Sequence, residues 1–223
     1  FLWTVLLGLL LKLGWLPEVT SRLLGAACGG AVLVLVTWWT RLYRGGRPSG
    51  WDGLAALWLA ASGGFVVWCS GGLETQLFTA LAVGGAARYC AEQARQPRWR
   101  WSGALFALAA LTRPEGVLLF GLTGLHRIAA NLLGERRLRP RWSEVGWVVG
   151  FLLPFGAHLA WRLHYYGFPF PNTFYIKAGG GAAASARQWG IPYLVDFLRD
   201  NQLWLLAPLL LALIVIRPRT AAS

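Results

Sequence analysis

Seven polar side chains outside the arginine-rich connections are the candidates for binding or chemistry. They lie in SGGLETQ, in TRPEG, near the end of a long apolar run and in PNTFYIK, and they are Glu74, Arg113, Glu115, Arg162, Asn172, Tyr175 and Lys177. Guanidinium and ammonium groups bind phosphate, and an amide such as Asn172 binds hydroxyl groups. Charges at a membrane boundary need each other, water or a ligand. These residue types therefore indicate a site for an anionic ligand.

Each stretch also has a purely structural interpretation. TRPEG is typical of a turn in which Pro114 opens the second helix and Glu115 favours its positive end. Glu74 fits the first turn of a helix that begins near Gly72. PNTFYIK fits a loop that rests on lipid headgroups through neighbouring aromatic residues. Arg113 is the residue that a simple turn does not require.

The composition places the chain in a membrane. Of its 223 residues, 56% are hydrophobic, the mean hydropathy is +0.49, and Asp and Glu together number nine, too few charges to cover a soluble globule of this length. The net charge of +12 comes from short basic clusters between apolar runs, a pattern that argues against nucleic-acid binding. The three cysteines show no metal or disulfide spacing.

Apolar runs predict an all-α integral membrane protein with about seven transmembrane helices, forming a single polytopic domain over residues 1–223. A span needs about 20 apolar residues. The predicted spans are 23–40, 52–69, 73–91, 101–113, 116–132, 144–164 and 203–216. Residues 1–16 are short for a span, so they predict one amino-terminal interfacial or membrane helix.

Arginine placement predicts the orientation of these spans. Basic residues accumulate in cytoplasmic loops, and here they cluster at 41–47, 88–100, 127–141 and 217–219. The alternate connections then face outward, including the long loop 165–202 between the last two spans. The seven candidate residues therefore belong to the extracytoplasmic side.

The chain begins at Phe1 within an apolar run and contains no Met. We therefore expect it to be a fragment that lacks an amino-terminal part. A signal peptide cannot be assigned to it.

Three motifs, SGGLETQLF, LFALAALTRPEGVLLF and YYGFPFPNTFYIKAG, resemble the polytopic GT-C glycosyltransferases. The likeness is to the arabinofuranosyltransferase-type and mannosyltransferase-type branch that uses polyprenyl-phosphate sugars. It implies a multi-pass protein of the plasma (inner) membrane. Its extracytoplasmic site would move a sugar to a cell-envelope glycan, a lipid or a protein.

The resemblance also implies roles for the candidate residues. Arg113, Arg162 and Lys177 would stabilise the departing phosphate. Glu74 and Glu115 would orient those cations, bind sugar hydroxyls or hold a divalent cation. The catalytic carboxylate of such enzymes lies on a first outer loop, which here would precede Phe1, so no catalytic residue is assigned.

Two other classes of protein stay open. A transporter or flippase would also place charges at helix ends, although the sequence shows no inverted repeat and its charges sit at one surface. A non-catalytic membrane subunit is the third interpretation, and it follows from the absent outer loop.

Overall fold

The computed structural model describes residues 1–95, 97–134, 141–169, 175 and 186–200. The chain divides into two compact units, Phe1–Tyr166 and Gly167–Ser223, and each is considered by itself. The predicted span 203–216 lies outside the described residues, as do Asn172 and Lys177.

The described residues form helices and no strand, which confirms the all-α prediction. The first unit contains α1 (Leu2–Lys12), α2 (Pro17–Tyr43), a 3₁₀ turn (Gly50–Gly53), α3 (Leu54–Ala60), α4 (Gly63–Ser70), α5 (Thr75–Arg95), α6 (Ser102–Thr112), α7 (Gly116–Ala129), a π-helical turn (Ala130–Gly134) and α8 (Trp142–Tyr166). The second unit contains another π-helical turn, Ala186–Gly190, and α11 (Ile191–Asp200).

Three described helices are long and apolar enough to cross a membrane: α2, α7 with its continuation to Leu133, and α8. The number rises to four if the bent pair Gly50–Ala60 and Gly63–Ser70 counts as one span. Large apolar side chains such as Leu122 and Leu153 are exposed on these helices, as expected where lipid covers a surface. The prediction of about seven spans is therefore wrong for the described residues.

Local sequence explains the difference. The predicted span 52–69 breaks next to Gly63 and Gly64, and its two helices meet at 71°. The predicted span 101–113 gives α6, an apolar helix of only 11 residues. Helix α5 has 21 residues, but Gln76, Arg88 and Glu92 reduce its hydropathy. Residues 1–16 give the short apolar helix α1, as predicted.

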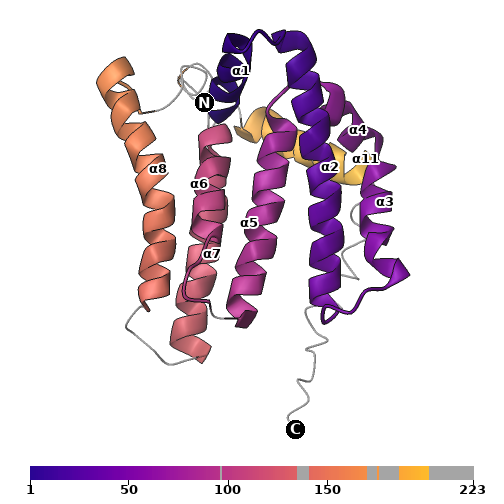
Figure 1. The fold of residues 1–223 in the computed structure, drawn as a ribbon, viewed down its shortest axis with the longest axis vertical. Helices are drawn as coiled ribbons and strands as arrows, with labels where there is room; N and C mark the ends of the chain where they lie inside the picture. The colour runs from indigo at the N-terminus through magenta and orange to yellow at the C-terminus, as the bar shows by residue number, and fades with distance from the viewer. Residues whose placement is uncertain (96, 135–140, 170–174, 176–185, 201–223) are drawn as a thin grey trace. The chain divides into compact units, whose positions relative to one another are not determined.

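Helix α6 lies at the centre of the first unit and packs against α5, α7 and α8, while α2 covers α5 on the other side (Figure 1). The core between them is largely aromatic. Phe106 of α6 is almost fully buried near Trp147 and Phe151 of α8, and Phe120 of α7 stacks on Phe151 with ring centroids 3.8 Å apart. Aromatic stacking therefore joins α7 to α8, and Phe106 adds α6 to the same buried cluster.

Small residues let α6 approach its neighbours closely. A Cβ on Gly103 would collide with the backbone carbonyl of Trp147, and a Cβ on Gly85 would lie 2.7 Å from the Phe106 ring. Glycine at such positions is a common device of helix packing in membranes, because it brings two backbones together. The Ala and Gly content of α6 thus has a packing function.

The first unit has two distinct ends. Helices α2, α5 and α7 end, and α6 and α8 begin, at what we call the arginine-rich end (Figure 1). The α6–α7 hairpin and the start of α5 lie at the opposite end, which we call the hairpin end. The structure therefore separates the predicted binding residues of this unit from the basic clusters.

Candidate functional site

The TRPEG stretch forms the tight connection between α6 and α7, as predicted. Helix α6 ends at Thr112, and Arg113 then takes an extended backbone with φ −143° and ψ 141°. Glu115 is the residue that precedes α7, and the Gly116 N–H donates to the Arg113 carbonyl over 3.0 Å. This geometry brings the side chains of Arg113 and Glu115 to the same side of the turn.

Arg113 and Glu115 form an ion pair with 2.9 Å between the guanidinium nitrogen and the carboxylate oxygen. The Arg113 and Glu115 side chains are 36% and 49% exposed. The Arg113 guanidinium also lies 5.7 Å from the ring centre of Phe78 on α5. Two contacts therefore position a cation that stays accessible.

The same pair shifts the titration of both groups. The hydrogen bond from Arg113 is the main reason why the pKa of Glu115 is lowered. That bond also raises the pKa of Arg113, with a smaller contribution from Glu74. Because both side chains are partly solvated, the pair adds little to stability. Its effect is to hold opposite charges in place at neutral pH.

Glu74 lies one turn before Phe78, whose N–H donates to the Glu74 carbonyl over 2.9 Å. The preceding Gly72 has φ +71°, and a Cβ there would meet the Ser21 hydroxyl at 2.9 Å, so glycine is required where this turn meets α2. The Glu74 carboxylate interacts electrostatically with Arg113. The start of α5 thus contributes a second carboxylate to the hairpin end.

Arg162 lies near the end of α8, with its guanidinium 5.2 Å from the ring centre of Tyr166. Helix α8 begins at the arginine-rich end, so Arg162 near its other terminus lies toward the hairpin end. Four of the seven predicted residues therefore occur at the hairpin end of the first unit. Tyr175 belongs to the second unit, where its ring lies 5.7 Å from Phe168.

The described part of the chain contains no group of three or more His, Cys, Asp or Glu that could hold an ion. Asp52, at the arginine-rich end, accepts a hydrogen bond from the Ser49 backbone N–H and pairs with Arg44 over 2.9 Å. Its role in this structure is to cap a helical turn.

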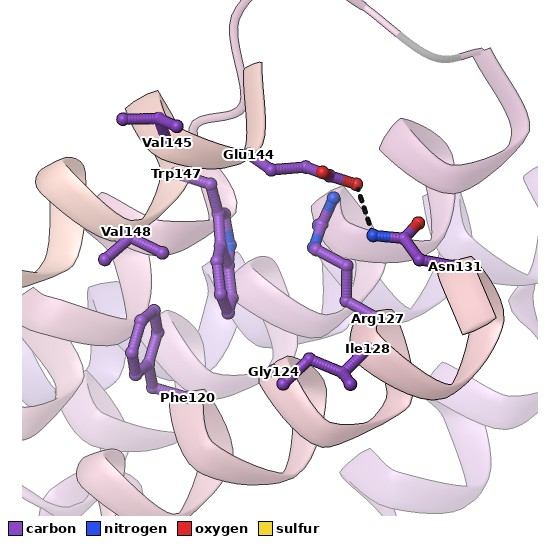
Figure 2. A pocket seen from close by; sticks show the side chains of 9 residues that line it. All are labelled: Phe120, Gly124, Arg127, Ile128, Asn131, Glu144, Val145, Trp147 and Val148. Carbon is purple, nitrogen blue, oxygen red and sulfur yellow. Dashed lines mark hydrogen bonds between the residues drawn. The ribbon is translucent and has the colours of Figure 1, made fainter. Parts of the chain in front are cut away.

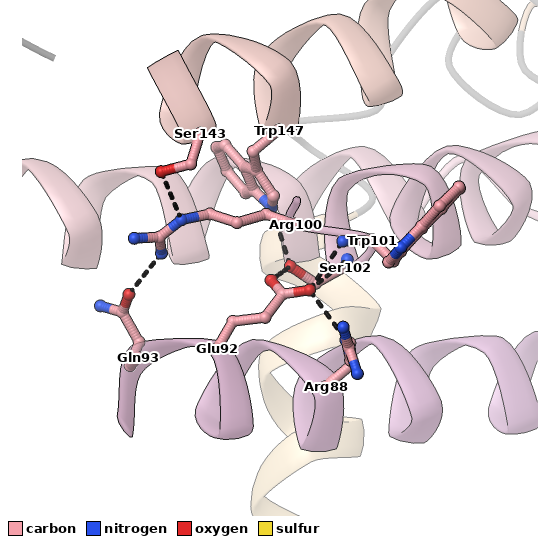
Figure 3. Close-up of polar contacts among 8 residues, drawn as sticks. All are labelled: Arg88, Glu92, Gln93, Arg100, Trp101, Ser102, Ser143 and Trp147. Carbon is pink, nitrogen blue, oxygen red and sulfur yellow. Dashed lines mark hydrogen bonds and ion pairs between the residues drawn. The ribbon is translucent and has the colours of Figure 1, made fainter. Parts of the chain in front are cut away.

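Sequence reasoning did not predict the polar network at the arginine-rich end (Figure 3). The Glu92 carboxylate of α5 is 1% exposed and accepts hydrogen bonds from the Arg88 side chain, from two backbone N–H groups at the start of α6 and from the Ser102 hydroxyl. Trp147 of α8 donates to that hydroxyl over 3.0 Å. The i,i+4 spacing of Arg88 and Glu92 was the available signal.

The position of Arg127 differs from the sequence-based prediction. The basic cluster 127–141 predicts a solvated cytoplasmic connection that includes Arg127. In the structure Arg127 lies in the last turn of α7 and is only 4% exposed. Its neighbour His126 meets the Tyr89 hydroxyl of α5 at 2.7 Å. Apolar side chains on other helices cover this turn, and a single sequence does not reveal which helices those are.

Comparison of the chain with protein-family models, with curated proteins and with solved structures gave no match.

Proposed function

We propose that this chain is the membrane-embedded part of a GT-C-type glycosyltransferase, with its ligand site at the hairpin end. It would move a sugar from a polyprenyl-phosphate donor to an extracytoplasmic glycan, lipid or protein. The observation that carries the proposal is the Arg113–Glu115 ion pair with Glu74 beside it. Two separate parts of the sequence thus supply charged groups to one end of a helical unit.

Arg113 is the residue proposed to bind the donor phosphate. A guanidinium has five N–H donors, and the ion pair with Glu115 directs one edge of it while the side chain stays 36% exposed. When the bond between the sugar and the phosphate breaks, negative charge builds on the leaving phosphate. A cation already held in place stabilises that charge without further reorganisation.

The other candidates complete the proposed site. Arg162 would add a second cation, while Glu74 and Glu115 orient the cations, bind sugar hydroxyls or hold a divalent ion. Asn172, Tyr175 and Lys177 belong to the second unit, so their part in donor binding rests on the sequence alone. No described residue is assigned as the base that accepts the proton of the acceptor hydroxyl.

The proposal includes a multi-pass arrangement in the plasma (inner) membrane, with the hairpin end extracytoplasmic. Helix α5 has 21 residues, which at 1.5 Å per residue is about the thickness of a hydrocarbon core. Its charged residues lie toward its carboxyl end, where they would meet the cytoplasmic surface.

Sugar transfer from a labelled polyprenyl-phosphate donor tests this function in membranes that contain the full-length protein. Arg113→Ala should abolish most of the transfer, whereas Arg95→Ala, an exposed arginine at the other end, should retain it. Both variants must insert at wild-type levels. Equal transfer by the two variants, or no donor binding and no transfer by the wild type, would oppose the proposal and favour a transporter or a non-catalytic subunit.

A further inference from the structure

A pocket of about 430 Å³ lies between α7 and α8 near the arginine-rich end (Figure 2). One side is apolar and includes Phe120, Ile128 and Val148. The other side carries Arg127 and the Glu144 carboxylate, which accepts a hydrogen bond from the Asn131 side chain over 3.0 Å. The pocket is thus apolar for most of its lining and charged along one wall.

The Arg127 guanidinium is the unusual feature of this wall. It lies 4.9 Å from the ring centre of Tyr89 and 4.7 Å from that of Trp147. Within the described residues, none of its three side-chain nitrogens has a hydrogen-bond partner. A buried charge without hydrogen bonds is destabilising, and cation–π contacts with the two rings offset only part of that cost. The guanidinium therefore keeps hydrogen-bond donors for which the described residues supply no acceptor.

The charges around the pocket also favour an anion. Arg88, Arg100, Arg127 and Arg141 lie at this end, and the opposing carboxylates in the described part of the chain are Glu92 and Glu144. The Glu92 carboxylate already binds Arg88 and the start of α6. Glu144 accepts hydrogen bonds from Asn131 and from the Arg141 backbone N–H. Among the described residues at this end, positive charge therefore exceeds negative charge even with both carboxylates ionised.

We propose that this pocket binds one anionic glycerophospholipid, with its phosphate on Arg127 and an acyl chain along the apolar wall. Both helices that form the pocket are candidate membrane spans. Arg127 lies in the last turn of α7, and the end of a membrane span is at the depth of the lipid headgroups. Basic pockets between membrane helices bind such headgroups. The guanidinium nitrogens are covered by side chains, so binding requires Arg127 to turn toward the pocket that it lines.

Native mass spectrometry of the detergent-purified full chain, with equal amounts of phosphatidylglycerol and phosphatidylcholine, tests the proposal. The wild type should retain about tenfold more phosphatidylglycerol, which corresponds to about 1.4 kcal/mol. Both lipids carry a phosphate, but the ammonium group of phosphatidylcholine neutralises its own phosphate and weakens the attraction to Arg127. Arg127→Gln should abolish this preference and Arg127→Lys should keep part of it. Arg95→Gln, which removes an exposed arginine from the same end, should behave as wild type.

A second variant keeps the test decisive if Arg127→Gln does not fold. Val148→Trp leaves Arg127 in place but fills the apolar side of the pocket, so it should also abolish the preference. An unchanged preference in a folded Arg127→Gln or Val148→Trp protein would overturn the proposal. It would also be overturned if inorganic phosphate alone displaced the lipid at micromolar concentration, because a free-anion site would then explain the charge.

Discussion

The carboxylate of Glu92 on α5 and the hydroxyl of Ser102 on α6 are joined by a hydrogen bond of 2.6 Å. The same carboxylate accepts the backbone N–H groups of Trp101 and Ser102 over 2.7 and 3.2 Å, so it satisfies the free donors at the start of α6. Because Trp147 of α8 donates to the Ser102 hydroxyl, one buried acid connects three helices.

Loss of Glu92 should therefore destabilise the first unit strongly. Glu92→Ala leaves a hydroxyl and two backbone donors without their acceptor, and we expect a loss of about 3 kcal/mol in the free energy of unfolding. Denaturant titration of the protein in detergent micelles measures this, with Arg95→Ala as the surface control. A loss below about 0.5 kcal/mol, the usual range for surface substitutions, would show that the network contributes little.

Gly103 offers an independent test of close helix packing. A Cβ at this position would collide with the Trp147 carbonyl, so Gly103→Ala should push α6 away from α8 and lower the melting temperature. Gly146 of α8 is the matched control, because a Cβ there meets nothing within 4 Å. Gly146→Ala should be neutral or stabilising by up to about 1 kcal/mol, since Ala favours a helix over Gly. Equal effects of the two substitutions would contradict this packing.

The sequence allowed correct prediction of the features that depend on local pattern. Apolar length predicts helices α2, α7 and α8, and Pro114 after a helical run predicts the hairpin turn. The break in the span 52–69 also had a local signal, Gly63 followed by Gly64, although apolar composition alone suggested one continuous span. Local backbone preferences and hydrophobic length are therefore readable from a single sequence.

Burial of charged residues was not predictable in the same way. Arg127 and Glu92 occur near helix ends, where arginines and glutamates are usually solvated. Their burial depends on Tyr89, Trp147 and Ser102, which are contributed by other helices. Such contacts depend on which helices become neighbours, and periodicity in one segment does not contain that information.

Titration of Glu115 should report the hairpin ion pair. The pKa of Glu115 is lowered in the folded protein, chiefly by the hydrogen bond from Arg113. The ion pair is therefore fully formed above the ordinary glutamate pKa, and it is lost as the pH falls through the lowered pKa. Carbon-13 NMR of the labelled carboxyl should give a pKa below that of an ordinary glutamate. Arg113→Ala should raise it toward the ordinary value, and Arg95→Ala should leave it unchanged. An identical Glu115 pKa in the wild type and in Arg113→Ala would show that the pair does not form in solution.

Accessibility mapping should place the two ends of the first unit on opposite sides of the membrane. In a protein whose three native cysteines are replaced by alanine, Glu115→Cys should react with a membrane-impermeant maleimide added to intact cells, because the hairpin end is proposed to face outward. Arg95→Cys should react only after the membrane is opened, since basic clusters favour the cytoplasm. Labelling of both positions from outside would contradict a bilayer crossing between them. Labelling of Arg95→Cys alone from outside would invert the orientation and move the proposed sugar-donor site to the cytoplasmic side.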